Sequence, residues 1–167
     1  MTERVIYVDE NDQPIGAGTR EEAWVNGTYV RLVRVMIRDE KGRILLQHRT
    51  KTVKSNPNLW TNSAGGYVDA GESWIDAANR EMHEEIGITT DLKIVGDFMY
   101  SEDKGDKKIR QFTRCYEGTI DSMTEFKLEE AEVAEVRWYG LDELKSLMKQ
   151  NPESFTPAFI ESINKFY

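Results

Sequence analysis

Apolar and β-branched residues occur in short runs along the first third of the chain, separated by polar turns. Val5–Val8 and Pro14–Gly16 flank a polar segment, which predicts a hairpin at the N-terminus. Tyr29–Arg38 and Arg43–His48 flank the turn Glu40–Gly42, which predicts a second hairpin. In the longer strand alternate residues fall on two faces, with Val33, Val35 and Ile37 on one and Val30, Leu32, Arg34, Met36 and Arg38 on the other.

A helical period begins after residue 72. Four apolar residues recur at spacings of three, four and four, which predicts one apolar stripe along a helix: Ile75, Ala78, Met82 and Ile86. Ser73 and Asp76 have the spacing of a capping box at its start. Gly87 stands where a left-handed residue ends many helices. The pattern therefore predicts a helix between Ser73 and Gly87.

The rest of the chain predicts a mixed α/β fold. The expected elements are a helical turn at 21–24, extended pieces within 60–68, strands at 92–100 and 108–119 joined by a charged turn at 103–107, a strand at 135–139, and helices at 141–149 and 156–166. A chain of 167 residues is close to the length of one domain. We expect a single domain over residues 1–167.

The charge balance narrows the choice of ligand. The chain has 22 basic and 30 acidic residues, a net charge of −8. A protein that binds nucleic acid through a broad basic face needs clustered Lys and Arg, so we expect no nucleic-acid partner. An anionic small molecule remains compatible if a local basic patch or a metal ion offsets the acids.

Cysteine content and hydropathy indicate a cytoplasmic protein. Cys115 is the single cysteine, so no internal disulfide and no cysteine-based zinc site is expected. The apolar stretch that follows Met1 is too short for the core of a signal peptide. No apolar run approaches the roughly 20 residues of a membrane span. We expect no membrane partner. Both a monomer and a homodimer stay open.

Carboxylates concentrate on the expected helix. Glu81, Glu84 and Glu85 stand at i, i+3 and i+4 and therefore share one face. Like charges so close repel, and a divalent cation with a preference for hard oxygen ligands, Mg²⁺ or Mn²⁺, would turn that repulsion into binding. Arg80 and Glu72 are placed to orient these carboxylates. The alternative is a solvated glutamate face without a metal.

The spacing around these glutamates resembles the Nudix box. Gly66 is followed after five residues by Glu72, and after seven more by Arg80-Glu81-Met82-His83-Glu84-Glu85-Ile86-Gly87-Ile88. All seven fixed positions and both aliphatic ones match. The resemblance implies an α/β/α sandwich with a mixed β-sheet and a central catalytic helix. It also implies cleavage of a diphosphate linked to a second group, X.

The resemblance also implies roles for individual residues. Glu81, Glu84 and Glu85 would bind the divalent metal, with a backbone carbonyl near Gly66, while Arg80 and Glu72 support them. Family members take the general base from the box or from a distant loop. Glu85 is one candidate. The other is the acidic run of Glu129, Glu130, Glu132 and Glu135, represented by Glu132, whose alternative is a solvated turn.

A second resemblance is to the type 1 isopentenyl-diphosphate isomerase branch of this family. It rests on Gln47-His48-Arg49, Lys51, Lys54, Pro57, Leu59-Trp60-Thr61-Asn62-Ser63, Gly66, Gly71-Glu72 and Phe155-Thr156-Pro157. Isomerase chemistry needs a cysteine where Gly65 stands and a histidine ligand where Tyr67 stands. Residues 1–47 contain no histidine and 107–114 no acid. We therefore expect an Mg²⁺-dependent hydrolase of a nucleoside di- or triphosphate or related small diphosphate, with an isomerase or a non-catalytic diphosphate sensor as alternatives.

A basic cluster precedes the glycine-rich segment. Arg49, Lys51 and Lys54 supply the local positive charge that a diphosphate substrate needs in an acidic chain. We expect them to hold the substrate phosphates. The alternative is that they only solubilise a loop.

Overall fold

The sheet is organised around its longest buried strand, β3 (Tyr29–Arg38). The computed structural model describes residues 3–167. Over that range a nine-stranded sheet is formed by β1 (Val5–Val8), β2 (Pro14–Gly18), β3, β4 (Ile44–Arg49), β5 (Trp60–Thr61), β6 (Ala64–Tyr67), β7 (Lys93–Lys104), β8 (Lys107–Thr119) and β9 (Val133–Tyr139). The helices are α1 (Arg20–Asn26), α2 (Trp74–Ile86), α3 (Leu141–Gln150) and α4 (Pro157–Phe166), with a 3₁₀ turn at Pro152–Ser154. Residues 1 and 2, the start of the stretch for which no signal peptide is expected, lie outside the described range.

β3 pairs antiparallel with β1, β4 and β6 and parallel with β8. Its register places Arg34 opposite Gly65 of β6 and opposite Cys115 of β8. The sheet is therefore mixed, as expected. β7 and β8 form a long hairpin whose turn is shorter than the expected charged segment and is closed by Gly105 with φ +59.

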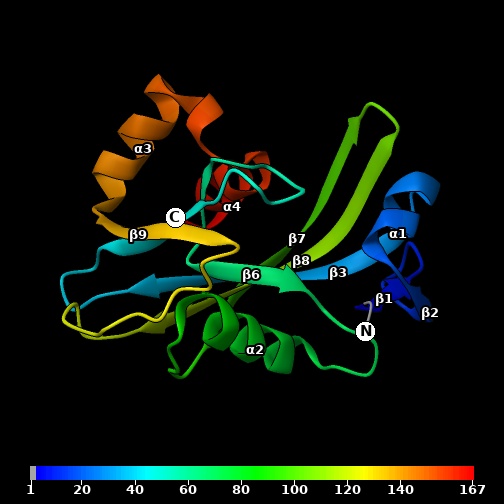
Figure 1. The fold of residues 1–167 in the computed structure, drawn as a ribbon, viewed down its shortest axis with the longest axis horizontal. Helices are drawn as coiled ribbons and strands as arrows, with labels where there is room; N and C mark the ends of the chain where they lie inside the picture. The colour runs from blue at the N-terminus through cyan, green and yellow to red at the C-terminus, as the bar shows by residue number, and fades with distance from the viewer. Residues whose placement is uncertain (1–2) are drawn as a thin grey trace.

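Both faces of β3 are buried, and helices cover each of them (Figure 1). Val33, Val35 and Ile37 belong to the core beneath α2. Met36, on the opposite face, belongs to the core that α3 and α4 complete with Phe159. The alternation expected from the sequence is confirmed, and the architecture is the expected α/β/α sandwich.

The expected hairpin between residues 29 and 48 is only partly formed. β3 and β4 pair at two positions, Ile37 with Leu45 and Arg38 with Ile44. β4 then diverges from β3 and pairs along its length with β9, while β6 occupies the space beside β3. This divergence brings the end of β4, at Arg49, to the cavity described below.

The buried face of α2 differs from the expected stripe. Ala78, Met82 and Ile86 are fully buried, but Ile75 is 38% exposed. The buried face is rotated toward the glutamates, so it includes Ala77 and Glu85 and leaves Ile75 in the first turn at its margin. The sequence misplaced this face because the position of Glu85 looked polar, whereas its side chain is buried.

The helix caps are partly as expected. Ser73 Oγ accepts a hydrogen bond from the Asp76 backbone N–H, but the Asp76 carboxylate bonds to the Ser73 hydroxyl, so the reciprocal half of the box is absent. A complete capping box occurs at Thr19 and Glu22, where none was expected. Gly87 ends α2 with φ +69, and a side chain there would collide with the backbone of Lys127.

Among the described residues, no helix is both long and apolar enough to span a bilayer.

Met82→Ala is expected to lower the free energy of unfolding by about 2–5 kcal/mol, because truncating this fully buried side chain leaves a cavity against the sheet. Ile75→Ala, on the same helix, is the matched control and is expected to cost less than about 1 kcal/mol. Urea unfolding followed by circular dichroism measures both. Equal losses for the two variants would contradict the rotated face.

Candidate active site

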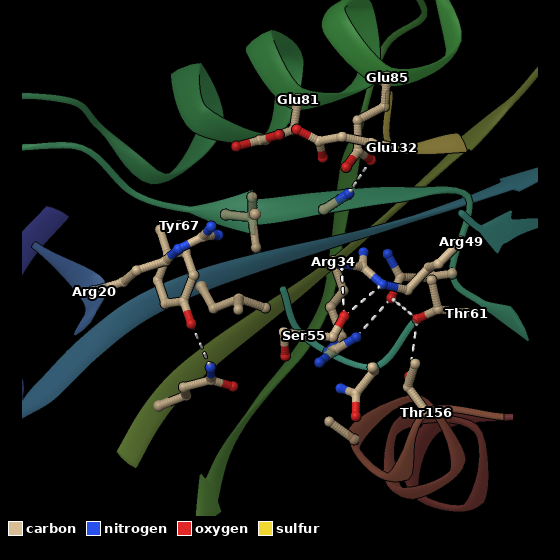
Figure 2. Close-up of a pocket in the computed structure, with 18 of the residues that line it drawn as sticks. Arg20, Arg34, Arg49, Ser55, Thr61, Tyr67, Glu81, Glu85, Glu132 and Thr156 are labelled. Carbon is tan, nitrogen blue, oxygen red and sulfur yellow. Dashed lines mark hydrogen bonds between the residues drawn. The ribbon is translucent and has the colours of Figure 1, made fainter. Parts of the chain in front are cut away.

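A cavity of about 520 Å³ lies where α1, β3, β6, α2 and the 129–132 loop meet. Carboxylates from α2 and the loop gather on one side of it: Glu81, Glu84, Glu85, Glu129 and Glu132. Three guanidinium groups line the cavity as well: Arg20, Arg34 and Arg49. Figure 2 shows Glu81, Glu85 and Glu132 near α2, with Arg34 and Arg49 on the other side of the β6 ribbon. The cavity is therefore polarised from an acidic to a basic side.

Glu85 is the most deeply placed carboxylate of the cavity. The residue is only 3% exposed, and burial raises the pKa of its carboxyl to about 7. Gln47 Nε2 and the Gly65 backbone N–H both donate to its Oε2, at 2.8 and 3.0 Å, and oppose that rise. Among the described residues its other oxygen, Oε1, accepts no hydrogen bond. One oxygen is anchored and the other is available to a ligand.

Glu81 is held by Arg80. Burial and the neighbouring Glu85 charge raise the pKa of the Glu81 carboxyl to about 8, although Arg80 opposes them. Arg80 Nη1 donates to Glu81 Oε1 at 2.8 Å. Arg80 Nε and Nη2 donate to the two oxygens of Glu72 at 2.8 and 3.0 Å, and Nη2 also donates to the Tyr67 carbonyl at 3.0 Å. Arg80 thus ties the loop before α2 to the helix, and the role of Arg80 and Glu72 in supporting the metal ligands stays a prediction.

Gly66 is required for the position of Glu81. A Cβ atom built on Gly66 would collide with the Glu81 carboxylate. β6 therefore lets the glutamate approach its backbone only because no side chain is present there. The glycine expected near the metal does lie beside an expected metal ligand.

The donor set fits a divalent cation. Glu81 and Glu85 supply closely spaced carboxylates whose ionisation is disfavoured by burial and by each other, and a cation between them would relieve that repulsion. Glu84 has a 56% exposed side chain and is accessible to the same face. Over residues 3–167 no three acidic, histidine or cysteine groups already meet in metal-binding geometry. Arg80 Nη1 lies 2.8 Å from Glu81 Oε1 and 3.4 Å from Oε2 of the partly exposed Glu84, so Glu84 would join as the third ligand on binding.

The late acidic run is held against α2. The Glu129 backbone N–H donates to the Glu85 carbonyl at 2.9 Å, which docks the loop on the helix end. Glu129 and Glu132 line the cavity, whereas Glu130 does not. Glu135 lies in β9 and pairs with Arg137 at 3.0 Å. The sequence presented these acids as one run, and the structure brings two of them to the cavity.

Of the three residues in the expected basic cluster, one lines the cavity and two do not. Arg49 lines the cavity, where its Nε and Nη2 donate to the Ser55 carbonyl. Lys51 and Lys54 are exposed on the following loop and do not line it, and Lys54 pairs with Glu21 at 3.2 Å. Their phosphate-binding role stays a prediction.

Arg20 and Arg34 line the cavity and were not singled out in the sequence. Arg34 carried a signal, because a charged residue stood at an inward position between Leu32 and Met36 of a buried strand. No sequence signal pointed to Arg20, because the short helix that positions it was expected to be only a helical turn.

Gly65 and Tyr67, where the resemblance to the isomerase branch leads one to expect a cysteine and a histidine, lie on β6. A Cβ atom at Gly65 would be 2.6 Å from the Val33 carbonyl oxygen and 2.9 Å from Asn62 Nδ2, so a cysteine would need a shift of backbone. The Tyr67 hydroxyl accepts a hydrogen bond from Gln111 Nε2 at 3.3 Å. Gly65 is thus closely packed, and the Tyr67 hydroxyl is held by Gln111.

Comparison with known proteins identifies the family. The model of the NUDIX domain matches residues 28–159, and the chain belongs to that family. The isopentenyl-diphosphate Delta-isomerase 2 of Photorhabdus laumondii is 32% identical over 98% of this chain and 92% of its own length. The Nudix hydrolase YfcD of Escherichia coli is 31% identical over 97% of this chain and 85% of its own.

The fold has a similar solved structure. The crystal structure of DR0079 from Deinococcus radiodurans superposes with a TM-score of 0.82 over 99% of both chains, at 22% identity. This likeness supports the fold. The family match also explains why residues of the isomerase branch occur together with a complete Nudix box.

Gly66→Ala is expected to weaken Mn²⁺ binding at least about tenfold, because the new methyl group displaces Glu81 from its place beside β6. Gly140→Ala is the control, since a Cβ there meets open space and φ is −64. Titration of free Mn²⁺ by electron paramagnetic resonance measures both affinities. Unchanged binding by Gly66→Ala would remove Glu81 from the cation site.

Proposed function

We propose that this protein is an Mg²⁺-dependent Nudix hydrolase that cleaves the phosphoanhydride bond of a small diphosphate, such as a nucleoside di- or triphosphate. One observation carries the proposal. The Arg80 guanidinium joins Glu72 to Glu81 beside the glycine strand that also donates to Glu85, and this arrangement presents two carboxylates to a cation. Mn²⁺ would serve the same oxygen ligands.

Glu81, Glu84 and Glu85 would hold the cation, with the backbone carbonyl of Gly66 beside them. When bound, the cation neutralises developing negative charge on the diphosphate and lowers the pKa of an attacking water. Arg80 keeps Glu81 and the loop before α2 in place. Arg49 is positioned to contact the phosphates, with Lys51 and Lys54 as further candidates on the adjoining loop.

The proton of the attacking water needs an acceptor other than the cation ligands. Glu85 has one oxygen anchored by Gln47 and Gly65, so its remaining oxygen cannot serve both the cation and the water. Glu132 lines the cavity, and its side chain has no hydrogen-bond partner among residues 3–167. We assign the cation to Glu85 and the proton to Glu132. The water oxygen bonds to phosphorus, the bridging P–O bond breaks, and the proton passes to the Glu132 carboxylate.

Isomerisation of a C5 diphosphate is the second candidate, favoured by the names of several relatives. The crowding at Gly65 and the tyrosine at position 67 argue against it. Product analysis separates the two reactions. With Mg²⁺ in ¹⁸O-labelled water, hydrolysis incorporates one ¹⁸O atom into a phosphate product, whereas isomerisation converts isopentenyl to dimethylallyl diphosphate without releasing phosphate. Formation of dimethylallyl diphosphate would overturn the proposal, as would an absence of turnover across nucleotides, dinucleotides, nucleotide sugars and prenyl diphosphates.

Glu84→Gln is expected to reduce turnover by at least about 100-fold, because it removes a charged ligand of the cation. The exposed position of Glu84 predicts an unchanged melting temperature. Glu130→Gln, equally exposed but outside the cavity, is expected to retain activity. Steady-state assays with the best substrate of the screen compare them. Wild-type activity in Glu84→Gln would exclude this glutamate from the cation site.

Glu132→Gln and Glu85→Gln are expected to fail for different reasons. Glu132→Gln should bind Mn²⁺ like the wild type and lose about 100-fold or more in kcat, the usual scale for loss of a general base. Glu85→Gln should lose Mn²⁺ affinity as well as kcat. Measuring metal affinity beside kcat distinguishes the roles. A normal kcat in Glu132→Gln would contradict this assignment and leave Glu85 as the candidate general base.

A further inference from the structure

Three guanidinium groups line the cavity together with its carboxylates. Arg20 comes from α1, Arg34 from the middle of β3 and Arg49 from the end of β4. In Figure 2 Arg20 lies beside Tyr67, and Arg34 and Arg49 lie together near Thr61. Three elements that are distant in sequence therefore direct guanidinium groups to one space.

Arg34 has no carboxylate partner among residues 3–167. Its Nη1 donates to Asn62 Oδ1 at 2.6 Å, which is a neutral acceptor. Its Nε is inaccessible to solvent and has no hydrogen-bond partner in that range. Buried donors of this kind are normally satisfied, so Arg34 indicates an acceptor supplied by a ligand.

The charges around each arginine differ. Burial lowers the pKa of Arg34, and Arg49 lowers it further. Burial also lowers the pKa of Arg49, but Glu85 and Glu132 oppose this effect. The groups that oppose it for Arg34 are the thiol of Cys115 and the hydroxyls of Tyr100 and Tyr67, which are neutral near pH 7. Glu85 and Glu132 thus act on Arg49, whereas no carboxylate is among the groups that act most strongly on Arg34.

We propose that Arg34, with Arg20, forms a second anion-binding subsite, which takes an additional phosphate carried by group X of the substrate. This inference rests on the proposed function for the orientation of the substrate, with its scissile diphosphate at the glutamates and X toward Arg34. The substrate class is a diphosphate whose X bears a phosphate monoester beyond the bond that is cleaved.

A neutral group X would leave the positive charge on the basic side of the cavity without a partner. A prenyl chain or an unphosphorylated nucleoside would leave the Arg34 guanidinium dehydrated and without a counter-charge, which is costly in a protein interior. A phosphate supplies a negative charge and several acceptor oxygens at once, so it can offset the charge of the Arg34 guanidinium and of Arg20. The cavity volume of about 520 Å³ accommodates a diphosphate with a phosphorylated sugar attached.

Binding of inorganic phosphate to metal-free protein tests the subsite without any need for turnover. In EDTA the glutamate side repels anions, so calorimetry with phosphate reports on the basic side. Arg34→Met is expected to weaken binding at least about tenfold, the effect of losing charge-assisted hydrogen bonds, and Arg34→Lys should weaken it less. Arg31→Met is the matched control, because Arg31 lies on the same strand but pairs with Asp12 at 2.7 Å. It should bind phosphate like the wild type.

Unchanged phosphate affinity in Arg34→Met, or no phosphate binding by the wild type, would overturn the subsite. Should Arg34→Met fail to fold, Arg34→Gln replaces it under the same criterion. Failure of the subsite is separate from failure of the proposed function, because hydrolysis depends on the glutamates and phosphate binding in EDTA does not.

Matched substrates test the assignment to X. NADPH and NADH, and coenzyme A and dephospho-coenzyme A, differ by one phosphate monoester on the ribose and share an internal diphosphate. The wild type is expected to prefer the phosphorylated member in kcat/KM by at least about tenfold, and Arg34→Met should lose that preference. Equal kcat/KM for both members in the wild type would overturn the assignment of the phosphate to X.

Discussion

The site depends on one packing arrangement, the close approach of α2 to a strand with two adjacent glycines. Gly66 lets the Glu81 carboxylate lie against β6, where a Cβ atom would collide with it, and the Gly65 backbone N–H donates to Glu85. The same approach buries the carboxylates and raises their pKa. Stability and chemistry therefore oppose each other here, since the ionised glutamates that a cation needs are costly to bury without one.

Arg80 reduces this cost and gives the site its shape. Its guanidinium bonds to Glu72, Glu81 and the Tyr67 carbonyl, so one side chain joins the glycine strand, the loop that follows it and the helix. A lysine could not make these directional contacts together, because it has a single nitrogen. The carboxylates are thus positioned by the fold before any ligand arrives.

Local patterns in the sequence predicted much of this structure. The two faces of β3 and the helix between Ser73 and Gly87 were predicted correctly, because alternation, capping and helical spacing depend on near neighbours. The sandwich was expected from the resemblance to the Nudix box. The box residues were readable because their spacing places them on one helix. Ile75 was misjudged because Glu85 takes a buried place that its polarity did not suggest.

Features that depend on distant pairing could not be read in the same way. β4 leaves β3 for β9, a choice set by residues almost a hundred positions apart, and that divergence brings Arg49 to the cavity. Arg20 on α1 and Arg34 on β3 line the same cavity because distant parts of the chain pack together, which no local pattern shows. Lys51 and Lys54 are close to Arg49 in sequence yet lie on the outside of the loop, because proximity along a chain does not determine direction.

The link between the 129–132 loop and α2 has a consequence for the evolution of such sites. The contact joins the Glu129 backbone N–H to the Glu85 carbonyl, so it is made by main-chain atoms alone. Nearly any residue at position 129 preserves it. The loop can therefore accumulate side-chain substitutions, and with them new substrate preferences, while the end of the helix and the cation ligands stay in register. Divergence of function within one scaffold needs no redesign of its centre.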